Sequence, residues 1–212
     1  MKLDSIRRDY KLASLAKENI KSDPIEFFSQ WMNEAIESGL QDATSMALAT
    51  AGSDGFPQSR IVLLKDFNSD GFTFFTNYQS EKGTAISENP KVSLHFFWSE
   101  LERQIRVTGI AEKTSEETSE KYFHSRPLDS QIAAAVSAQS SEVPSRTSLE
   151  EKFSDLKNQL NGKNPELPEN WGGYLVRPVK FEFWQGRANR LHDRIIYEKQ
   201  TGKSWLIKRL AP

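Results

Sequence analysis

Hydrophobic and polar residues alternate through much of this chain, the pattern of strands that bury one face. Between residues 44 and 113 the alternation runs through TSMALATA, PQSRIVLLK, FTFFTN, KVSLHFFW and LERQIRVTGIAEK. The segments GSDG and DFNSDG between the first three predict turns, and a short helix is expected over 80–89. The pattern returns in GGYLVRPVKFEFWQG, RLHDRIIYEK and SWLIKRL. We therefore expect an antiparallel sheet.

Helical periodicity marks the front of the chain and one insertion. Asp23 is placed as an N-cap before Pro24, and apolar residues then recur at helical spacing up to Ile36. The stretches SEETSEKYFHS, SQIAAAVSAQ and TSLEEKFSDLKNQL predict three more helices. Strands interrupted by helices, without a strand-helix-strand rhythm, favour a mainly β fold with helical insertions (α+β), a small closed barrel. We expect one domain over 23–212 behind a flexible arm over 1–22.

The composition excludes several kinds of site. The chain has no cysteine, so disulfides, zinc-thiolate sites, iron-sulfur clusters and thiol nucleophiles are ruled out. No pair of histidines has metal-ligand spacing, and we expect no metal. The formal net charge of −1 gives no general attraction to nucleic acid or to a membrane. With no apolar run of membrane-spanning length and no apolar leader, a cytoplasmic location is expected.

The segment RLHDR is the first candidate for chemistry. If it is extended, Arg190, His192 and Arg194 share one face. Trp184, just upstream in FEFWQG, could cover an aromatic ring. The alternative is an ordinary strand face with solvated arginines.

The segment RIVLLK is the second candidate. Arg60 and Lys65 are five positions apart, so in a regular strand they point to opposite faces. Such a strand would serve two anionic groups rather than one phosphate. The alternative is a core strand with charged ends.

The segment KYFHSRPLDS is the third candidate. Tyr122 and Arg126 lie four apart on one helical face, and Pro127 ends that helix and starts another near Ser130. An arginine beside a helix start and a hydroxyl can trap an anion. An ordinary corner between two helices remains the alternative. Gln139 and Ser140 add neutral donors and acceptors, a weak signal on their own.

Taken together, these segments resemble the pyridoxamine 5′-phosphate oxidase family. The resemblance runs in order through RRDY, SRIVLLKDF, FFTNYQSEKG, ENPKVSLHFFW, LERQIRVTG, KYFHSRPLDSQI, AQSS, WGGYLVRP, FEFWQGRANRLHDR and KRLAP. It implies an antiparallel, Greek-key split β-barrel that binds FMN at the subunit interface of a homodimer. It also implies oxidation of pyridoxamine or pyridoxine 5′-phosphate to pyridoxal 5′-phosphate, with O2 as acceptor and H2O2 as by-product.

The resemblance also implies roles for individual residues. The residues expected to hold FMN are Arg60, Ile61, Val62, Leu63, Leu64, Lys65, Phe75, Thr76, Lys82, Gln104, Gln139, Ser140, Trp184 and Arg194. Those expected to hold the substrate are Arg7, Tyr10, Lys65, Tyr122, Arg126, Ser130, Arg190 and His192. Of these, Arg190 and His192 are the catalytic candidates, Arg190 over the substrate ring and His192 bonded to its hydroxyl or phosphate. Asp42 matches a carboxylate near that site.

One position departs from the family pattern. Glu81-Lys82 stands where Arg-Lys is common, so weaker FMN retention is expected. The alternatives to the oxidase are another split-barrel flavoprotein, such as a flavin reductase, and a non-catalytic carrier of FMN or pyridoxal phosphate. The Tyr122, Arg126, Ser130 and Arg190 set favours the oxidase over the reductase. A nucleic-acid-binding module is a distant third, suggested only by the basic C-terminal end.

Overall fold

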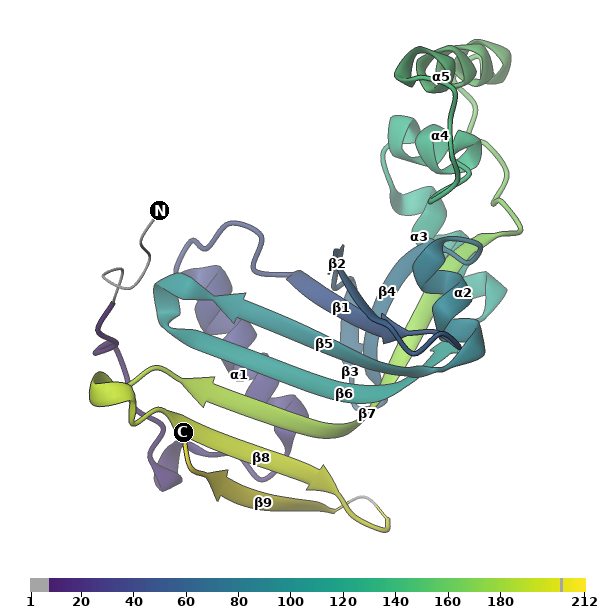
Figure 1. The fold of residues 1–212 in the computed structure, drawn as a ribbon. Helices are drawn as coiled ribbons and strands as arrows, with labels where there is room; N and C mark the ends of the chain where they lie inside the picture. Colours follow the sequence, from purple (N-terminus) through teal and green to yellow (C-terminus); the bar gives the residue numbers. More distant parts are fainter. Residues whose placement is uncertain (1–7, 203) are drawn as a thin grey trace.

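The computed structural model describes residues 8–202 and 204–212, and its main feature is one curled antiparallel sheet (Figure 1). The hydrogen-bonded order is β2-β1-β5-β6-β7-β4-β3, with β8 on β7 and β9 on β8. The strands are β1 (Ser45–Ala51), β2 (Pro57–Leu63), β3 (Asp66–Asn68), β4 (Gly71–Asn77), β5 (Lys91–Trp98), β6 (Arg103–Lys113), β7 (Trp171–Gln185), β8 (Asp193–Lys199) and β9 (Trp205–Leu210).

The long strand β7 divides the sheet. Residues 171–176 pair with β4, and residues 180–185 pair with β8. Pro178, which has no N–H to donate, lies between the two pairings, and the register with β6 shifts between Thr108 and Gly109. The bulge and the missing donor let the two halves of β7 diverge, which curls the sheet into a half-barrel.

The expectation of a closed barrel is wrong in one respect. Among the described residues, β2 pairs only with β1 and β3 pairs only with β4, so the hydrogen-bonded ladder stays open between these ends. The mainly β fold with helical insertions is confirmed. The segment DFNSDG, predicted to be a turn, contains the short strand β3. Its first three residues pair with β4, and the chain then reverses before Gly71.

Helices cover one face of the sheet and extend one end of it. The helices are α1 (Pro24–Glu37), α2 (Glu81–Glu88), α3 (Glu116–Ser125), α4 (Leu128–Val136) and α5 (Arg146–Leu160), with short 3-10 turns η1 (Lys17–Asn19), η2 (Ser99–Leu101) and η3 (Ala188–Arg190). No helix in the described ranges is long and apolar enough to cross a bilayer.

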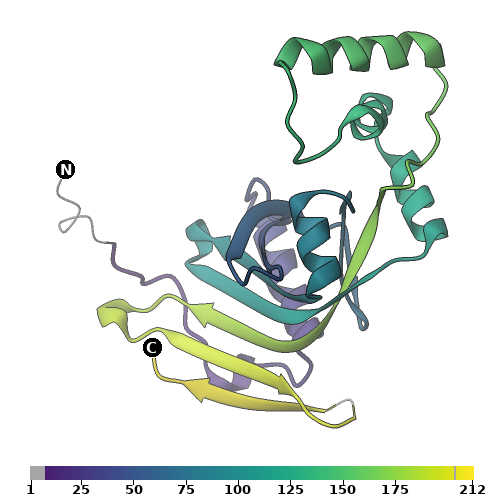
Figure 2. The ribbon, with the colours of Figure 1, turned by 45° about the vertical axis from the view of Figure 1, so that its right-hand side comes forward.

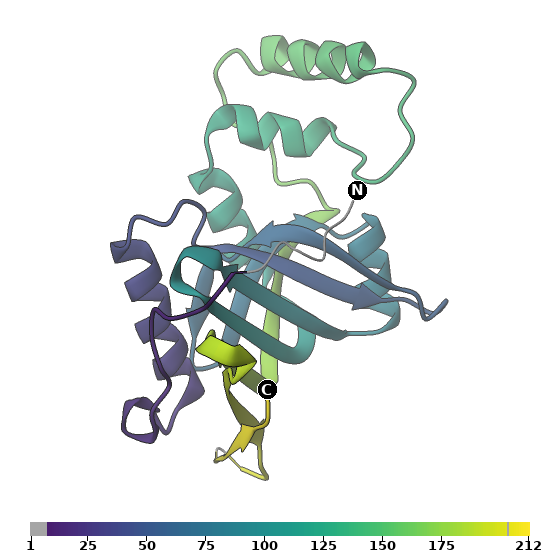
Figure 3. The same cartoon turned by 60° about the vertical axis from the view of Figure 1, so that its left-hand side comes forward.

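The core lies between α1 and the sheet (Figure 3). Asp23 caps α1 by accepting a hydrogen bond from the Ile25 backbone N–H at 2.8 Å, as predicted. The helix then buries Phe27 against Phe183, with ring centroids 4.4 Å apart. Met32 on α1 and Met46 on β1 belong to the same core, and both are buried.

The other face of the sheet carries uncovered apolar residues. Ala47 of β1 is the register partner of Ile61 on β2 and of His95 on β5, so these residues lie on one face of the sheet. Phe97 is two residues after His95 on β5 and therefore lies on the same face as Ile61. Ile61 is 67% exposed and Phe97 is 56% exposed. Large exposed apolar groups on one sheet face are typical of a surface that another protein covers.

The helices α3, α4 and α5 form an arm at the N-terminal end of β7 (Figure 2). In the figure, α5 lies farthest from the sheet, and its contacts are chiefly with α4. It begins at Ser145, whose hydroxyl accepts from the Ser148 backbone N–H, and ends at Asn161 in a left-handed conformation.

The segment RLHDR is not an extended strand throughout, so the predicted common face for Arg190, His192 and Arg194 is wrong. Strand β8 begins only at Asp193. Asn189 and Arg190 both have positive φ, 57° and 60°, in the turn η3. Two successive left-handed residues reverse the chain, which removes the alternation on which the prediction rested.

Candidate functional site

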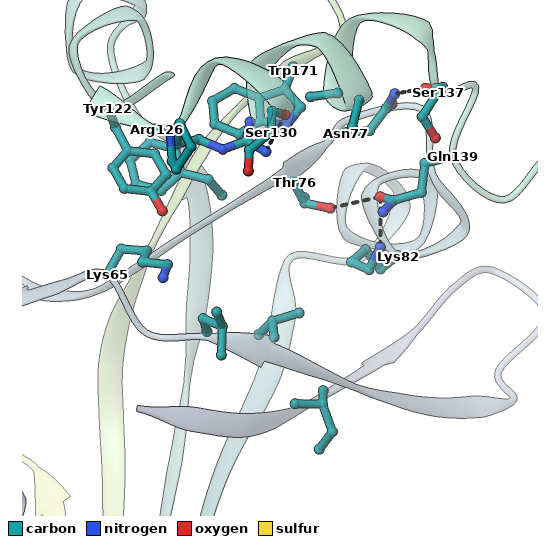
Figure 4. Close-up of a pocket in the computed structure, with 17 residues that line it drawn as sticks. Lys65, Thr76, Asn77, Lys82, Tyr122, Arg126, Ser130, Ser137, Gln139 and Trp171 are labelled. Carbon is teal, nitrogen blue, oxygen red and sulfur yellow. Dashed lines mark hydrogen bonds between the residues drawn. The ribbon is translucent and has the colours of Figure 1, made fainter. Parts of the chain in front are cut away.

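A cavity of about 590 Å³ lies where the helical arm meets the sheet (Figure 4). Its walls come from the end of β2, from β4, from the start of α2, and from α3 and α4. The lining residues are Ile61, Val62, Leu63, Lys65, Phe75, Thr76, Asn77, Lys82, Tyr122, Arg126, Pro127, Ser130, Ala133, Ala134, Ser137, Gln139 and Trp171. Its size suits a small organic ligand.

Arg126 forms one corner of this cavity. It ends α3 in an extended conformation, as expected of a residue before proline. One terminal nitrogen donates to the Ser130 carbonyl at 2.7 Å, and the guanidinium lies 4.9 Å from the centre of the Trp171 ring. The other terminal nitrogen, Nη1, is buried and has no hydrogen-bond partner among the described residues. Burial lowers the pKa of Arg126. A buried cationic donor with an unused N–H needs an acceptor, and an anion would supply one.

Tyr122 and Lys65 complete this corner. The Tyr122 ring stacks on Phe75 and lies parallel to Trp171, with planes 19° and 6° apart. Burial raises the pKa of Tyr122, although Arg126 opposes the shift, so the hydroxyl keeps its proton. Figure 4 shows the Tyr122 hydroxyl and the Lys65 ammonium directed into the cavity below Arg126 and Ser130. The predicted Tyr122, Arg126 and Ser130 set is therefore brought together, with Lys65 added.

Lys82 forms a second corner, on the opposite side of the view in Figure 4. Its ammonium donates to Gln139 Oε1 at 3.0 Å and to Ser80 Oγ at 3.2 Å. Thr76 Oγ1 donates to the same amide oxygen at 3.1 Å. The Lys82 residue is only 8% exposed, and burial followed by the nearby Arg60 lowers its pKa, while Glu81 opposes the shift. A buried ammonium held by neutral oxygens is a place where an anion is favoured.

The structure separates Arg60 from Lys65, as their odd spacing predicts. Lys65 lines the cavity, whereas the Arg60 guanidinium donates to Thr50 Oγ1 at 2.7 Å and to Gln58 Oε1 at 3.2 Å. Burial lowers the pKa of Arg60, and the Glu81 carboxylate opposes that shift. Arg60 does not line the cavity, but its positive charge acts on Lys82 and therefore adds to the positive charge of that corner.

A second group of predicted residues lies at the far end of β7, away from the cavity. Gln104, Trp184 and Arg194 are register partners across β6, β7 and β8. The His192 ring lies 4.7 Å from the Trp184 ring and 5.6 Å from the Tyr10 ring, measured between centroids. We name the cluster of Tyr10, Trp184 and His192 the second half-site, because predicted site residues lie together here outside the cavity.

The His192 tautomer is fixed by the backbone. Its Nδ1 accepts a hydrogen bond from the Arg187 N–H at 3.1 Å, so the neutral ring carries its proton on Nε2. Burial, and then the neighbouring Arg190, lower the pKa of His192. Near neutral pH, His192 is therefore a neutral ring that can donate through Nε2.

Glu182 organises the cations beside this cluster. Its buried carboxylate accepts from Arg194 Nε at 2.8 Å and from Arg106 on the neighbouring strand. Burial alone would raise the pKa of Glu182, but these two guanidinium groups outweigh it and hold the pKa below its ordinary value. Sequence reasoning missed Glu182, although FEFWQG places it two residues before Trp184 on the same strand face.

The N-terminal segment crosses this second half-site. The Leu12 N–H donates to Glu102 at 2.9 Å, and the Leu15 N–H donates to Asp193 at 3.0 Å. Arg209 donates to the Leu15 carbonyl at 2.6 Å. These contacts place Tyr10 against Trp184 and His192. Arg7, the other predicted residue of this segment, lies outside the described residues.

The predicted residues thus fall into two groups that one chain does not bring together. Those in the cavity lining are Ile61, Val62, Leu63, Lys65, Phe75, Thr76, Lys82, Tyr122, Arg126, Ser130 and Gln139. Those outside it are Tyr10, Arg60, Leu64, Gln104, Ser140, Trp184, Arg190, His192 and Arg194.

Leu64, Ser140 and Asp42 neither line the cavity nor belong to the second half-site. The Leu64 side chain is buried in the core. Ser140 lines a neighbouring cavity of about 530 Å³, together with Glu81. Asp42 lies in the turn before β1 with a φ of 58° and lines no cavity described here. No cluster of potential metal ligands occurs among the described residues.

Sequence reasoning also missed parts of the cavity wall. Trp171 stacks against Tyr122, and Asn77 donates to the Ser137 carbonyl at 3.4 Å, which ties β4 to the segment after α4. WGGYLVRP contained Trp171, but only the fold shows that its ring reaches α3.

Two family models match the chain. One, described as pyridoxamine 5′-phosphate oxidase, matches residues 32–159. The other, described as the pyridoxine 5′-phosphate oxidase C-terminal dimerisation region, matches residues 171–212, which include Trp184, Arg190 and His192.

Curated relatives and solved structures agree with these models. A pyridoxine/pyridoxamine 5′-phosphate oxidase of Leptospira interrogans is 50% identical over 211 residues, covering 100% of this chain and 99% of the relative. One of Flavobacterium johnsoniae is 52% identical over 210 residues, covering 99% and 98%. PhzG from Burkholderia lata, solved with tetrahydrophenazine-1-carboxylic acid, superposes with a TM-score of 0.89 at 28% identity, covering 95% and 99%. A related FMN binding protein of Nostoc punctiforme shares the fold, with a TM-score of 0.73 at 16% identity, covering 91% and 100%.

Proposed function

Because the chain belongs to the pyridoxamine 5′-phosphate oxidase family, we propose that it oxidises pyridoxamine or pyridoxine 5′-phosphate to pyridoxal 5′-phosphate. The proposed cofactor is FMN, the acceptor is O2 and the by-product is H2O2. The observation that carries this proposal is the pair of cationic corners in one cavity. Within the described part of the chain, Arg126 has an N–H without an acceptor, and the hydrogen bonds of the Lys82 ammonium go to neutral oxygens. Two phosphorylated ligands in one cavity would need two such corners.

The Lys82 corner suits the phosphate of FMN. Lys82, Thr76 and Gln139 converge there, and Arg60 adds charge from β2. The exposed side chains Ile61 and Leu63 leave a flat apolar strand beside the corner for the flavin ring. When bound, FMN would accept a hydride from the substrate and pass two electrons to oxygen.

The Arg126 corner suits the substrate phosphate. Arg126 would satisfy its free N–H there, and Ser130 lies at the start of α4, where backbone N–H groups favour an anion. Tyr122 and Lys65 would supply a further donor and a charge. The phosphate would then hold the pyridine ring at a fixed distance from the flavin, which makes the transfer effectively intramolecular.

We propose that the working site is shared between two subunits of a homodimer. Trp184, Arg190 and His192 are far from the cavity of their own chain, and the C-terminal region that carries them matches a dimerisation region. The uncovered sheet face with Ile61 and Phe97 offers the apolar surface that such a dimer would bury. Each cavity would receive its second half-site from the partner.

Arg190 and His192 would then position the substrate. The Arg190 guanidinium would pack over the pyridine ring and orient C4′ toward the flavin. His192 would donate its Nε2 proton to the ring hydroxyl or the phosphate, because Nδ1 is already occupied by the Arg187 N–H. For the amine substrate, loss of a hydride from C4′ of the neutral amine would give an iminium that water hydrolyses, so neither residue would have to remove a proton. The alcohol substrate would also have to release its hydroxyl proton, which water can accept.

The test is a spectral titration of the purified holoprotein. Anaerobic addition of pyridoxine 5′-phosphate should bleach a yellow flavin spectrum, and admission of air should restore it with release of H2O2. A carrier would bind FMN or pyridoxal phosphate without bleaching, and a flavin reductase would bleach with NADH or NADPH but not with the vitamin phosphate. Either result would overturn the oxidase proposal. The expected cytoplasmic location remains a prediction.

A further inference from the structure

We propose that the negative charge of Glu81 weakens the binding of the FMN phosphate. The affinity for FMN would then be lower than Lys82 and Arg60 would give in the absence of that charge. The proposal rests on the proposed FMN site at Lys82. It assigns an opposing role to a charged residue that the proposed reaction does not use.

The position of Glu81 follows from the start of α2. Ser80 is the N-cap, with its hydroxyl accepting from the Gly83 N–H at 3.4 Å, and Glu81 is the first helical residue. Lys82 turns inward to Gln139, whereas Glu81 is exposed and lines the neighbouring cavity of about 530 Å³. Gln139 lines both cavities, so this residue borders the cavity that Lys82 lines as well as the cavity that Glu81 lines.

Two cations face this carboxylate, Lys82 on its own helix and Arg60 on β2. The carboxylate raises the pKa of both, although burial lowers each overall. The hydrogen bonds of Lys82 and Arg60 within the described part of the chain go to neutral oxygens. Asp54 and Glu88 are the other acidic residues of the second cavity. A phosphate held by Lys82 and Arg60 would therefore meet a like charge at Glu81.

The magnitude of the effect follows from exposure. Glu81 is solvent-exposed, so its repulsion of a phosphate acts through a high dielectric and is screened by salt. A repulsion of this kind corresponds to roughly a 3- to 10-fold loss of affinity at low ionic strength. The competing explanation is that Glu81 only stabilises the start of α2 through the helix dipole. That role would not distinguish ligands with and without a phosphate.

Riboflavin provides this distinction, since it has the flavin ring without the phosphate. FMN and riboflavin would each be titrated into the apo form of the whole chain, with flavin fluorescence giving Kd. Glu81→Gln should tighten FMN binding roughly 3- to 10-fold and change riboflavin binding less than about 2-fold. Glu81→Arg should tighten FMN further, and both gains should shrink in high salt.

Glu26→Gln is the matched control. Glu26 is an exposed carboxylate in the first turn of α1 and lines neither cavity, so its loss removes the same charge and the same helix-dipole contribution. It should leave both affinities unchanged. Equal changes for FMN and riboflavin in Glu81→Gln, or no change for FMN in both Glu81 variants, would overturn the proposal. If the wild-type chain bound neither flavin, the proposed function would fall as well, so the two failures are distinguishable.

Discussion

Tyr122 of α3 stacks face to face on Phe75 of β4, with ring centroids 3.9 Å apart and planes 19° apart. This pair joins the helical arm to the sheet, and Trp171 of β7 extends it on the same side. Stacked aromatic pairs add stability beyond the area they bury. Because the Tyr122 ring packs against these two aromatic rings, its hydroxyl is held in one direction, into the cavity (Figure 4).

Tyr122→Phe should separate these two roles. The variant keeps the stack and loses only the hydroxyl, so we expect KM for the vitamin phosphate to rise roughly 10- to 150-fold, the value of one hydrogen bond to a charged group. FMN content and Tm should stay near the wild-type values. Tyr122→Ala should lower Tm as well. If Tyr122→Phe lost FMN instead, the hydroxyl would belong to the cofactor corner.

Arg126→Ala should weaken substrate binding far more than flavin binding. A hydrogen bond to a charged group contributes about 1.5–3 kcal/mol, so the loss should raise the substrate Kd roughly 10- to 150-fold. Bound FMN, measured from the visible spectrum, should be nearly unchanged. Arg146→Ala, on the exposed face of α5, is the control and should alter neither quantity. Loss of FMN with an unchanged KM would contradict the assignment of two separate phosphate corners.

A mixture of two impaired variants, assayed at a substrate concentration below the wild-type KM, should regain activity if the site is shared. Arg126→Ala damages the cavity, and His192→Ala damages the second half-site. In a heterodimer of the two, one site is doubly damaged and the other is intact. Co-refolding equal amounts should therefore restore about a quarter of wild-type activity, because half of the dimers formed at random are mixed. No recovery, with heterodimers shown to form, would mean that each chain uses its own His192.

Glu182→Gln should make stability less sensitive to acid. The folded pKa of Glu182 is lowered, so its stabilisation is present above the ordinary value of 4.5 and is lost as pH falls through the folded pKa. At neutral pH the variant should lose about 1–3 kcal/mol of unfolding free energy, less than for a fully buried pair because Arg106 is half-exposed. The difference from wild type should shrink below about pH 4.

Urea unfolding at neutral pH and in acid would measure this difference. Glu150→Gln removes an exposed partner of Arg146 and serves as the control, with an expected change below about 0.5 kcal/mol at either pH. The unfolding free energies of Glu182→Gln and wild type could instead differ by the same amount at neutral and acid pH. That result would show that Glu182 stabilises the fold through hydrogen bonds and not through its charge.

Gly186→Ala should detach the N-terminal segment from the second half-site. A Cβ at Gly186 would lie 2.7 Å from Cγ of Tyr10, closer than carbon atoms approach, so the Tyr10 ring must move. Trypsin cleavage after Arg8 or Lys11 should become several-fold faster, as expected when a local docking contact is lost. In a Tyr10→Gly background, which removes the Tyr10 Cβ as well as the ring, the same Gly186 substitution should add nothing to the cleavage rate.

The strands were predictable because successive side chains of a strand point to opposite faces of the sheet, so apolar and polar residues alternate when one face is buried. In β6, for example, Ile105 and Val107 are buried while Arg106 and Thr108 face out, as their order indicates. The Tyr122 and Arg126 corner was predictable for a related reason, since helical spacing alone puts residues four apart on one face. The curling of the sheet into a half-barrel was not predictable, because it depends on the bulge at Thr108 and on Pro178.

The second half-site was less accessible to sequence reasoning. The expected alternation at Arg190 failed because two left-handed residues in succession leave no periodic trace. The partners of the N-terminal segment, Glu102 and Asp193, lie 90 and 178 residues from the atoms they bind. Contacts of that kind are set by tertiary packing, and no local pattern predicts them.

The burial of Met32 and Met46 in the core bears on durability under oxidative conditions. Sulfur is the atom of proteins most readily attacked by peroxide, and exposed thiols and thioethers are its first targets. This chain has no thiol, and the two thioethers among the described residues are 3% and 1% exposed. A chain that releases H2O2, as proposed for this one, would therefore expose few sulfur atoms of its described residues to that product.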